Sequence, residues 1–306
     1  MDTRLVGEIA AIMTALLWTS NSILFTSAGK RIGSVSVNAI RIAIAVGLLA
    51  ITHFILLGAF IPAVSSEQWL WIGMSGIIGL GIGDFALFAA FVIIGPRRSV
   101  LMMAMSPIFA AFAALILLDE MLSPAAILGI AVTLAGIIIV ILEREEASNE
   151  KPLTRSIKIR GTALAFVGAV GQGIGIVFAK KGMLLSPETG LDLTLSTTLI
   201  RMMAGALFVW TAVIIGGRLP ELRRALGDRK AMAETSVGAF LGPFIGVTLS
   251  MVAVLYTQAG VAQTLMSLQP VIIIPVIWLL YRQKTSWRGI TGAIIAVTGV
   301  AILFLV

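Results

Sequence analysis

Residues Leu101 to Pro107 read LMMAMSP, and residues Thr264 to Pro270, 163 positions further along, read TLMSLQP. The same shift of 163 residues places four glycines of the first half on four glycines of the second half: Gly79 on Gly242, Gly83 on Gly246, Gly129 on Gly292 and Gly136 on Gly299. A spacing that holds at so many positions indicates a duplicated structural unit. The chain is therefore predicted to contain two copies of one fold.

The repeat extends toward the N-terminus of each copy with slightly different shifts. A shift of 160 residues pairs Arg41 with Arg201, and a shift of 154 residues pairs Trp18 with Gln172. Changing shifts indicate insertions in loops. The longest polar stretch, Glu143 to Lys158 (EREEASNEKPLTRSIK), lies between the two copies. We therefore predict a first repeat over residues 1–146, a linker over 147–158 and a second repeat over 159–306.

The composition is that of an integral membrane protein. Hydrophobic residues make up 58% of the chain and charged residues only 12%, against about 25% charged residues in soluble domains. A membrane-spanning helix needs about 20 mostly apolar residues. Ten runs meet that length: 6–28, 35–58, 69–94, 98–118, 123–142, 160–181, 193–215, 235–257, 261–281 and 286–306. The predicted fold class is an all-α membrane protein with ten transmembrane helices.

Cysteine is absent and His53 is the single histidine, so no thiolate site and no histidine-rich metal cluster can form. We expect no metal and no cofactor. The net charge is +7, but the basic residues are scattered through short connections and form no stripe of the kind that binds nucleic acid. The expected partners are the lipid bilayer and a small-molecule substrate, with the protein as a monomer or a homodimer.

Each predicted repeat has five helices, which is an odd number. The second copy must then enter the membrane from the opposite side. The two halves become inverted repeats related by a pseudo-two-fold axis in the membrane plane. Many secondary transporters have this arrangement, with the substrate site near the midplane between the repeats. The parity of the repeat thus points to transport.

Lysine and arginine are distributed unevenly between the two sides. Of the 22 basic residues, Arg41 and Arg201 lie within predicted spans, and 17 lie in odd-numbered connections, with Arg97 and Arg98 expected in the connection after the third span. Only Arg4, Lys180 and Lys181 lie on the other side. Because basic loops stay in the cytoplasm, we expect a multi-pass protein of the cell inner membrane with cytoplasmic odd-numbered loops and both termini outside.

Two stretches of the first half resemble a known family. Ser106 to Glu120 (SPIFAAFAALILLDE) and Leu128 to Gly136 (LGIAVTLAG), with Gly242 to Ser250 (GPFIGVTLS) in the second half, are similar to the EamA-domain branch of the drug/metabolite transporter superfamily. The resemblance covers essentially the whole chain. It implies alternating-access transport, and its range of substrates runs from amino acids, sugars and nucleotide sugars to phosphorylated metabolites and drugs.

The chain departs from that family in two respects. The acidic end of the fourth helix, Asp119-Glu120, is replaced in the second half by Arg282-Gln283. Many relatives are thought to keep both termini in the cytoplasm, which is opposite to the orientation that the basic residues predict here.

Asp84 is the leading candidate for chemistry. It lies in GLGIGDFALFAAF (Gly79 to Phe91), about 15 Å from the end of its predicted helix at 1.5 Å per residue. An isolated carboxylate at that depth is costly, so it must be protonated, paired or facing water. One interpretation is a carboxylate that couples transport to protons; the other is a structural aspartate that pairs with arginine or caps a broken helix. Its repeat counterpart is Val247, which favours a single coupling site.

Arg41 and Arg201 are the candidate partners of Asp84. A guanidinium also recognises a substrate carboxylate or phosphate with two parallel hydrogen bonds. Arg41 lies closer to a helix end, where its side chain is expected to extend toward the membrane surface. Arg201 lies deeper and is the stronger candidate for a buried role.

Four further polar or aromatic residues are predicted to contact substrate, namely Trp18, Asn21, Gln172 and Gln269. Hydrogen bonding between helices is the alternative role for their amides. Pro107, Pro243 and Pro270 each remove a backbone hydrogen bond within a predicted span. They are candidate hinges for alternating access, or fixed kinks.

The sequence therefore favours a secondary-active transporter, a proton-coupled exporter or exchanger, for a small polar or amphipathic metabolite. A non-transporting scaffold or lipid-handling protein is the alternative. An enzyme is not expected, and no catalytic residue is assigned, because the acidic residues form no pair on one helix face that would hold Mg²⁺.

Overall fold

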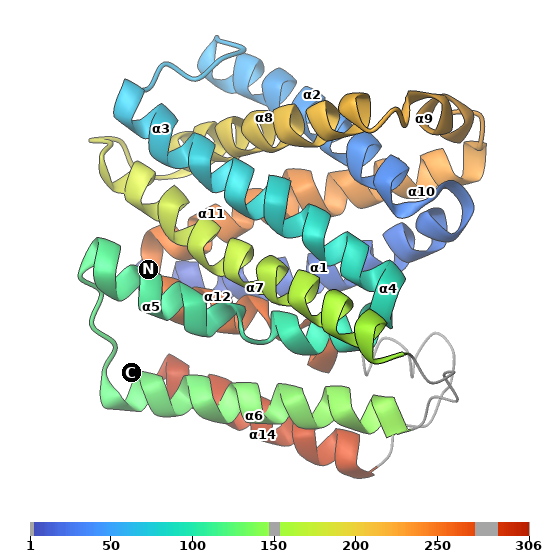
Figure 1. Ribbon diagram of the computed structural model, residues 1–306. Coiled ribbons are helices and arrows are strands. Elements are labelled where there is room, and N and C mark those ends of the chain that lie inside the picture. The colour runs from blue at the N-terminus through green and yellow to red at the C-terminus, as the bar shows by residue number, and fades with distance from the viewer. Residues whose placement is uncertain (1–2, 147–153, 273–286, 306) are drawn as a thin grey trace.

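The computed structural model describes residues 3–146, 154–272 and 287–305, and within them every regular element is helical (Figure 1). The first half contains α1 (Thr3–Ile32), α2 (Ser34–Leu57), α3 (Ser66–Ser75), η1 (Gly76–Gly83), α4 (Asp84–Met103), α5 (Ser106–Leu118) and α6 (Pro124–Glu146). The second half contains α7 (Arg155–Leu184), α8 (Leu191–Ile215), α9 (Leu219–Ala225), α10 (Arg229–Ala239), η2 (Phe240–Gly246), α11 (Val247–Tyr256), α12 (Ala259–Met266) and α14 (Trp287–Phe304).

Nine of the helices in these described ranges are long and apolar enough to cross a membrane. The predicted run 261–281 begins in α12 and continues outside the described residues. The structure therefore agrees with an all-helical membrane protein and gives nine of the ten predicted spans. Both labelled chain ends lie at the left of Figure 1, so α1 starts at that end of the bundle.

The third helix of each half contains a π-helical segment. In the first half α3, η1 and α4 follow one another without a break, and η1 covers eight residues. In the second half α10, η2 and α11 do the same, and η2 covers seven residues. The two segments lie at positions related by the 163-residue shift. π-Helical turns are rare and are frequently found at functional sites. A π-helical segment at the same place in both repeats therefore makes these segments a candidate location for the functional site.

The two halves contact each other reciprocally through these segments. The η1 segment packs against α7 and α8, whereas η2 packs against α1 and α2. A Cβ atom added to Gly83 would lie 3.5 Å from the backbone nitrogen of Gln172, and one added to Gly246 would lie 2.9 Å from Nε1 of Trp18. Trp18 and Gln172 occupy equivalent positions in the two repeats, as do Gly246 and Gly83. The contact of Gly83 with Gln172 is therefore the repeat equivalent of the contact of Gly246 with Trp18.

Helices α6 and α14 repeat the same exchange. A Cβ atom added to Gly136 would lie 2.5 Å from the carbonyl oxygen of Gly292, and one added to Gly129 would lie 3.2 Å from that of Gly299. The 163-residue shift relates Gly136 to Gly299 and Gly129 to Gly292, so the Gly136–Gly292 contact is the repeat equivalent of the Gly129–Gly299 contact. In Figure 1, α7 starts at the right end of the bundle and α1 at the left end. The packing and the opposite directions fit two inverted repeats.

Enlarging Gly136 is expected to separate α6 from α14. In Gly136→Ala the new methyl group would lie 2.3 Å from the backbone nitrogen of Ala296, and overpacking of this kind costs about 1–3 kcal/mol. Thermal unfolding of the purified protein in detergent should show the loss. Gly47→Ala in α2 is the matched control, because nothing lies within 4 Å of its added Cβ. Equal melting temperatures for the two variants would contradict this contact.

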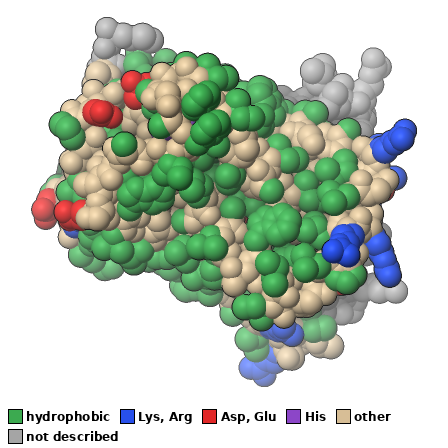
Figure 2. All heavy atoms as spheres, turned by 90° about the horizontal axis from the view of Figure 1, so that it is seen from above, with side chains coloured by type: hydrophobic (Ala, Val, Ile, Leu, Met, Phe, Trp, Pro, Cys, Tyr) green, Lys and Arg blue, Asp and Glu red, His purple; other side chains and the backbone are tan. Residues whose placement is uncertain are grey.

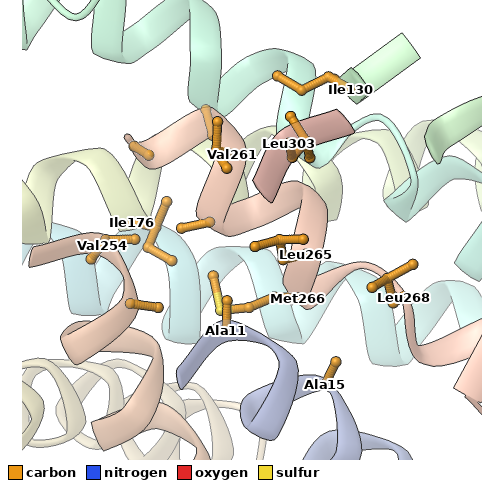
Figure 3. Close-up of a cluster of buried hydrophobic side chains, with 14 of the residues drawn as sticks. Ala11, Ala15, Ile130, Ile176, Val254, Val261, Leu265, Met266, Leu268 and Leu303 are labelled. Carbon is orange, nitrogen blue, oxygen red and sulfur yellow. The ribbon is translucent and has the colours of Figure 1, made fainter. Parts of the chain in front are cut away.

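The largest hydrophobic core lies along the seam between the halves. Figure 3 shows Leu265 and Met266 of α12 directed toward Ala11 of α1, with Ile176 of α7 beside them. Leu265, Met266 and Ala11 are fully buried. Small alanines on α1 allow the long side chains of α12 to approach its backbone. The halves are therefore held by shape complementarity as well as by polar contacts.

The third predicted span, 69–94, is longer in the structure. Its last part, α4, continues to Met103, so the backbone at Arg97 and Arg98 is helical and the connection expected there is wrong. The break comes instead at the turn formed by Ala104 and Met105. Helical hydrogen bonding can continue through polar residues beyond the apolar core, so a hydropathy boundary does not have to be a helix boundary.

The three prolines lie in two different settings. Pro107 lies in the first turn of α5, where its missing N–H leaves no helical bond unmade. Pro270 similarly follows a turn at Ser267 and Leu268. The expectation that each of these two removes a backbone hydrogen bond within a helix is therefore wrong. Pro243 lies inside η2 and does remove one.

Asp228 caps α10 and ties it to α1. Its side chain accepts a hydrogen bond from the backbone N–H of Ala231 at 3.0 Å and lies 2.9 Å from Nε of Arg31. The Ala231 bond, followed by that from Arg31, lowers the pKa of Asp228 below its usual value. A lowered folded-state pKa means that the contribution to stability is present above the unfolded-state pKa and is lost as the pH falls through the folded-state pKa.

The melting temperature is accordingly expected to depend less on acidic pH in Asp228→Asn than in the wild type. Asparagine caps a helix about as well as aspartate but does not titrate. Thermal unfolding between about pH 6 and pH 3 measures the difference. Glu221→Gln, at an exposed position of α9, is the control for the loss of one carboxylate. A pH profile unchanged by the Asp228 substitution would contradict this role.

Candidate functional site

Asp84 lies at the centre of the longest helical stretch. It is the first residue of α4, directly after η1, and only 7% of its surface is exposed. Its backbone N–H donates to the carbonyl oxygens of Gly79 and Gly81. Glycines of η1 and α7 let these two helices approach closely, since a Cβ atom on Gly171 would lie 3.0 Å from Cα of Gly83 and one on Gly175 would lie 3.0 Å from Cα of Gly79. The carboxylate of Asp84 is therefore buried among the helices.

Asp84 is paired through both carboxylate oxygens. Nη2 of Arg41 forms an ion pair with Oδ2, and Nε2 of Gln172 donates to Oδ1 at 2.6 Å. The same Gln172 nitrogen lies 3.2 Å from the carbonyl oxygen of Gly79. Arg41, on α2, and Asp84 belong to the first half, and Gln172, on α7, belongs to the second. The network therefore connects the two repeats at mid-depth.

Arg41 turns inward, so the expectation that it extends toward the membrane surface is wrong. Its Nε donates to Oδ1 of Asn38 at 2.9 Å, and its Cζ lies 5.6 Å from the ring centre of Phe25 and 5.1 Å from that of Phe88. Aromatic faces stabilise a guanidinium while they exclude water. The sequence reasoning missed Asn38 and both rings, although the three-residue spacing of Asn38 and Arg41 on one helix face was an available signal.

Arg201 lies beside this network but does not join the ion pair. It is 3% exposed, its Nη1 donates to Sδ of Met251 at 3.1 Å, and among the described residues its Nε has no hydrogen-bond partner. A Cβ atom on Gly79 would lie 3.4 Å from its Nη2. Of the two predicted partners of Asp84, the structure therefore brings only Arg41 into direct contact.

Trp18 and Asn21 lie at the symmetry-related place on η2. A Cβ atom on Gly242 would overlap Nδ2 of Asn21 at 1.7 Å, and Asn21 is 8% exposed. Trp18 packs in a hydrophobic cluster that includes Leu80 and Val247, the repeat counterpart of Asp84. Gln269 is half-buried and joins no described contact with Asp84. The predicted residues thus divide between η1, η2 and a separate position in the second half.

A second buried ion pair joins the halves at the end of the bundle that holds the termini. Lys180 of α7 pairs with Glu120, which follows α5, and its Nζ also donates to the carbonyl oxygen of Thr257 at 2.7 Å. Glu120 accepts a hydrogen bond from the backbone N–H of Ala259 at 2.8 Å. Lys180 is 6% exposed. Lys180, which the sequence placed among the few basic residues of the outer side, is therefore buried between the two halves.

A pocket of about 340 Å³ opens at this same end. It is lined by Arg4, Met121, Ser123, Ala126, Tyr256, Thr257, Gln258, Val261 and Leu303. These residues come from both halves and include neither Asp84 nor Arg201. The pocket therefore lies beside the Glu120–Lys180 pair and apart from the mid-depth network.

The two ends of the bundle carry opposite charge. Figure 2 shows acidic side chains at the left, where the termini lie, and lysine and arginine side chains at the right. Helix first turns supply Glu67 and Asp192 to the acidic end. The basic end includes Lys30 and Arg31 from the last turn of α1. No group of three or more acidic, histidine or cysteine side chains suited to a metal ion occurs in the described ranges.

Comparison with known proteins identifies the family. A family model described as the EamA-like transporter family matches residues 5–142 and again residues 159–305. No curated protein matches the chain. One solved crystal structure, described simply as that of a protein, is similar with a TM-score of 0.75 and 18% identity, covering 98% of this chain and 96% of that one; this similarity supports the fold alone. Because the family model covers nearly the whole chain, the chain belongs to the EamA-like transporter family.

Proposed function

We propose that this protein is a secondary-active transporter that moves a small polar or amphipathic metabolite by alternating access, coupled to protons through Asp84. The observation that carries the proposal is the buried Arg41–Asp84–Gln172 network, which connects the two halves at mid-depth. Holding a charged pair in an apolar core is costly. That cost is understandable if the pair must change during transport.

Protonation of Asp84 provides the switch. The ionised carboxylate holds Arg41 from α2 and Gln172 from α7 together. A neutral carboxyl group loses the ion pair with Arg41 within the first half. Its hydrogen bond from Gln172 changes from a charge-assisted bond to a weaker neutral one, so the contact between the halves weakens at this level. Proton binding from one side and release to the other thereby changes the contact between repeats, as alternating access requires.

The π-helical segments are the proposed positions of bending. Both η1 and η2 lie at the contact between halves, and Pro243 leaves η2 with one backbone hydrogen bond fewer. Pro107 and Pro270 each follow a turn, so α5 and the helix after Leu268 can reorient about those turns. We propose all three prolines as hinges, with Pro107 and Pro270 acting at helix starts.

The charge difference between the ends supports an orientation. The basic end, with Lys30 and Arg31, is proposed to face the cytoplasm of a cell whose inner membrane holds the protein, with both termini outside. The chain has no cysteine, so a single introduced cysteine gives an unambiguous label. A membrane-impermeant maleimide added to intact cells should label Glu188→Cys, and it should not label Lys30→Cys.

Transport itself is tested in proteoliposomes. A compound that raises the melting temperature of the purified protein is loaded outside the vesicles, and a pH gradient is imposed. The expected result is accumulation above the equilibrium level, abolished by a protonophore. A compound that binds but never crosses the membrane would instead support the alternative of a scaffold or lipid-handling protein.

A further inference from the structure

The buried charges of the described spans are paired with one exception. Four charged residues each have less than a tenth of their surface exposed to solvent: Glu8, Asp84, Lys180 and Arg201. Glu8 pairs with Arg4 at 2.9 Å, and Asp84 and Lys180 have the partners given above. In the part of the chain that the structure describes, Arg201 alone among these four has no carboxylate within ion-pair distance.

The sequence offers no obvious carboxylate to complete the pairing of Arg201. No aspartate or glutamate follows Glu234, so the segment 273–286 cannot supply one. Asp84 is the one acidic residue near the middle of an apolar run, and its two oxygens already accept from Arg41 and Gln172. Two guanidinium groups and one carboxylate leave the mid-depth network with one uncompensated positive charge.

The surroundings of Arg201 suit an exchangeable ligand. Its Nη1 donates to the thioether of Met251, a weak and neutral acceptor, and its Nε has no described acceptor. No side chain of Gly79 covers Nη2, from which an added Cβ atom would lie 3.4 Å. Nε and Nη2 lie on one edge of the guanidinium group. An incoming carboxylate can therefore bind these two nitrogens while Nη1 keeps its weak bond to Met251.

We infer that the transported substrate is a small organic anion with one carboxylate, which Arg201 binds through two guanidinium nitrogens. The inference rests on the proposed transport function and specifies its substrate class. One negative charge neutralises the network, whereas a phosphate dianion overcompensates it. Gln172 is placed to donate to the same substrate when Asp84 is protonated, because its Nε2 already lies beside both Asp84 and Gly79.

Thermal unfolding with matched compounds tests this inference. The probes are sets that differ in one group: lactate, lactamide and 1-amino-2-propanol; 3-phenylpropionate, 3-phenylpropionamide and 3-phenylpropylamine; glycerol 3-phosphate and glycerol. At least one carboxylate is expected to raise the melting temperature by about 3 °C or more at saturation, and its amide or amine is not. Arg201→Gln should lose the shift, and Arg201→Lys should weaken the apparent affinity at least tenfold.

Met251→Leu is the matched control, because it removes the sulfur contact and keeps the charge of Arg201. It should retain the shift. The inference is overturned if no carboxylate raises the melting temperature, if the phosphate alone does, or if a neutral or cationic compound does so equally in wild type and Arg201→Gln. Uptake in proteoliposomes separates the two proposals. Transport of a neutral or cationic compound contradicts the anion inference and leaves transport standing; an Arg201-dependent shift without uptake supports an anion site and contradicts transport.

Discussion

Asp84→Asn is expected to destabilise the protein by about 3 kcal/mol, because it leaves the Arg41 guanidinium buried without its counter-charge. The rings of Phe25 and Phe88 pack against the Arg41 guanidinium and only 12% of its side chain is exposed, so water can replace only part of the lost interaction. Asparagine keeps an oxygen that can accept from Gln172, so the loss reports mainly on the ion pair. Thermal unfolding in detergent at neutral pH measures it.

The double variant Asp84→Asn/Arg41→Gln separates structure from function. Removing both charges also removes the cost of an unpaired one, so the double variant should be more stable than Asp84→Asn alone. It should still lack proton coupling, since the Asp84 carboxylate that would bind the proton is absent. If Asp84→Asn were as stable as the wild type, Asp84 and Arg41 would not form the pair described here.

Glu120→Gln is expected to cost about 3 kcal/mol, while Lys180→Met costs much less. The first change leaves the Lys180 ammonium buried with the Thr257 carbonyl as its remaining partner. The second change replaces that ammonium by an apolar side chain of similar length. Glu120 then keeps the backbone N–H of Ala259 and retains some access to water, with 14% of its side chain exposed. Replacing a buried ion by an apolar group is often close to neutral.

Thermal unfolding of both single variants and of Glu120→Gln/Lys180→Met checks this asymmetry. The double variant should recover most of the stability that Glu120→Gln loses. Glu188→Gln, at an exposed position of the same end, controls for general loss of charge. A larger loss in Lys180→Met than in Glu120→Gln would show that the ammonium contributes net stability, contrary to this account.

Much of the architecture could be predicted from the sequence. The shift of 163 residues paired Gly79 and Gly83 with Gly242 and Gly246, and the structure places these four glycines in the two π-helical segments. The π-helical form itself was not predicted. The apolar run around Asp84 was long enough to place that residue deep in the membrane. Gln172 was predicted to contact substrate, with hydrogen bonding between helices as the alternative; the structure shows its hydrogen bond to Asp84, and contact with substrate stays a prediction.

The direction of long side chains could not be predicted. Arg41 and Lys180 both lie near enough to helix ends to extend into water, and hydropathy does not show that a carboxylate from another helix is within reach. Helix boundaries were also misplaced. The run 98–118 was predicted as one continuous helix, yet it contains the turn at Ala104 and Met105. Pro107 favours the first turn of a new helix, which explains why a helix begins there.

The most direct test of the central claim compares wild type with Asp84→Asn/Arg41→Gln in proteoliposomes under an imposed pH gradient, using the compound that thermal unfolding identifies. The account predicts that the wild type accumulates this compound above equilibrium, and that the double variant only equilibrates it. Accumulation by the double variant to the wild-type level would contradict the assignment of Asp84 as the coupling residue.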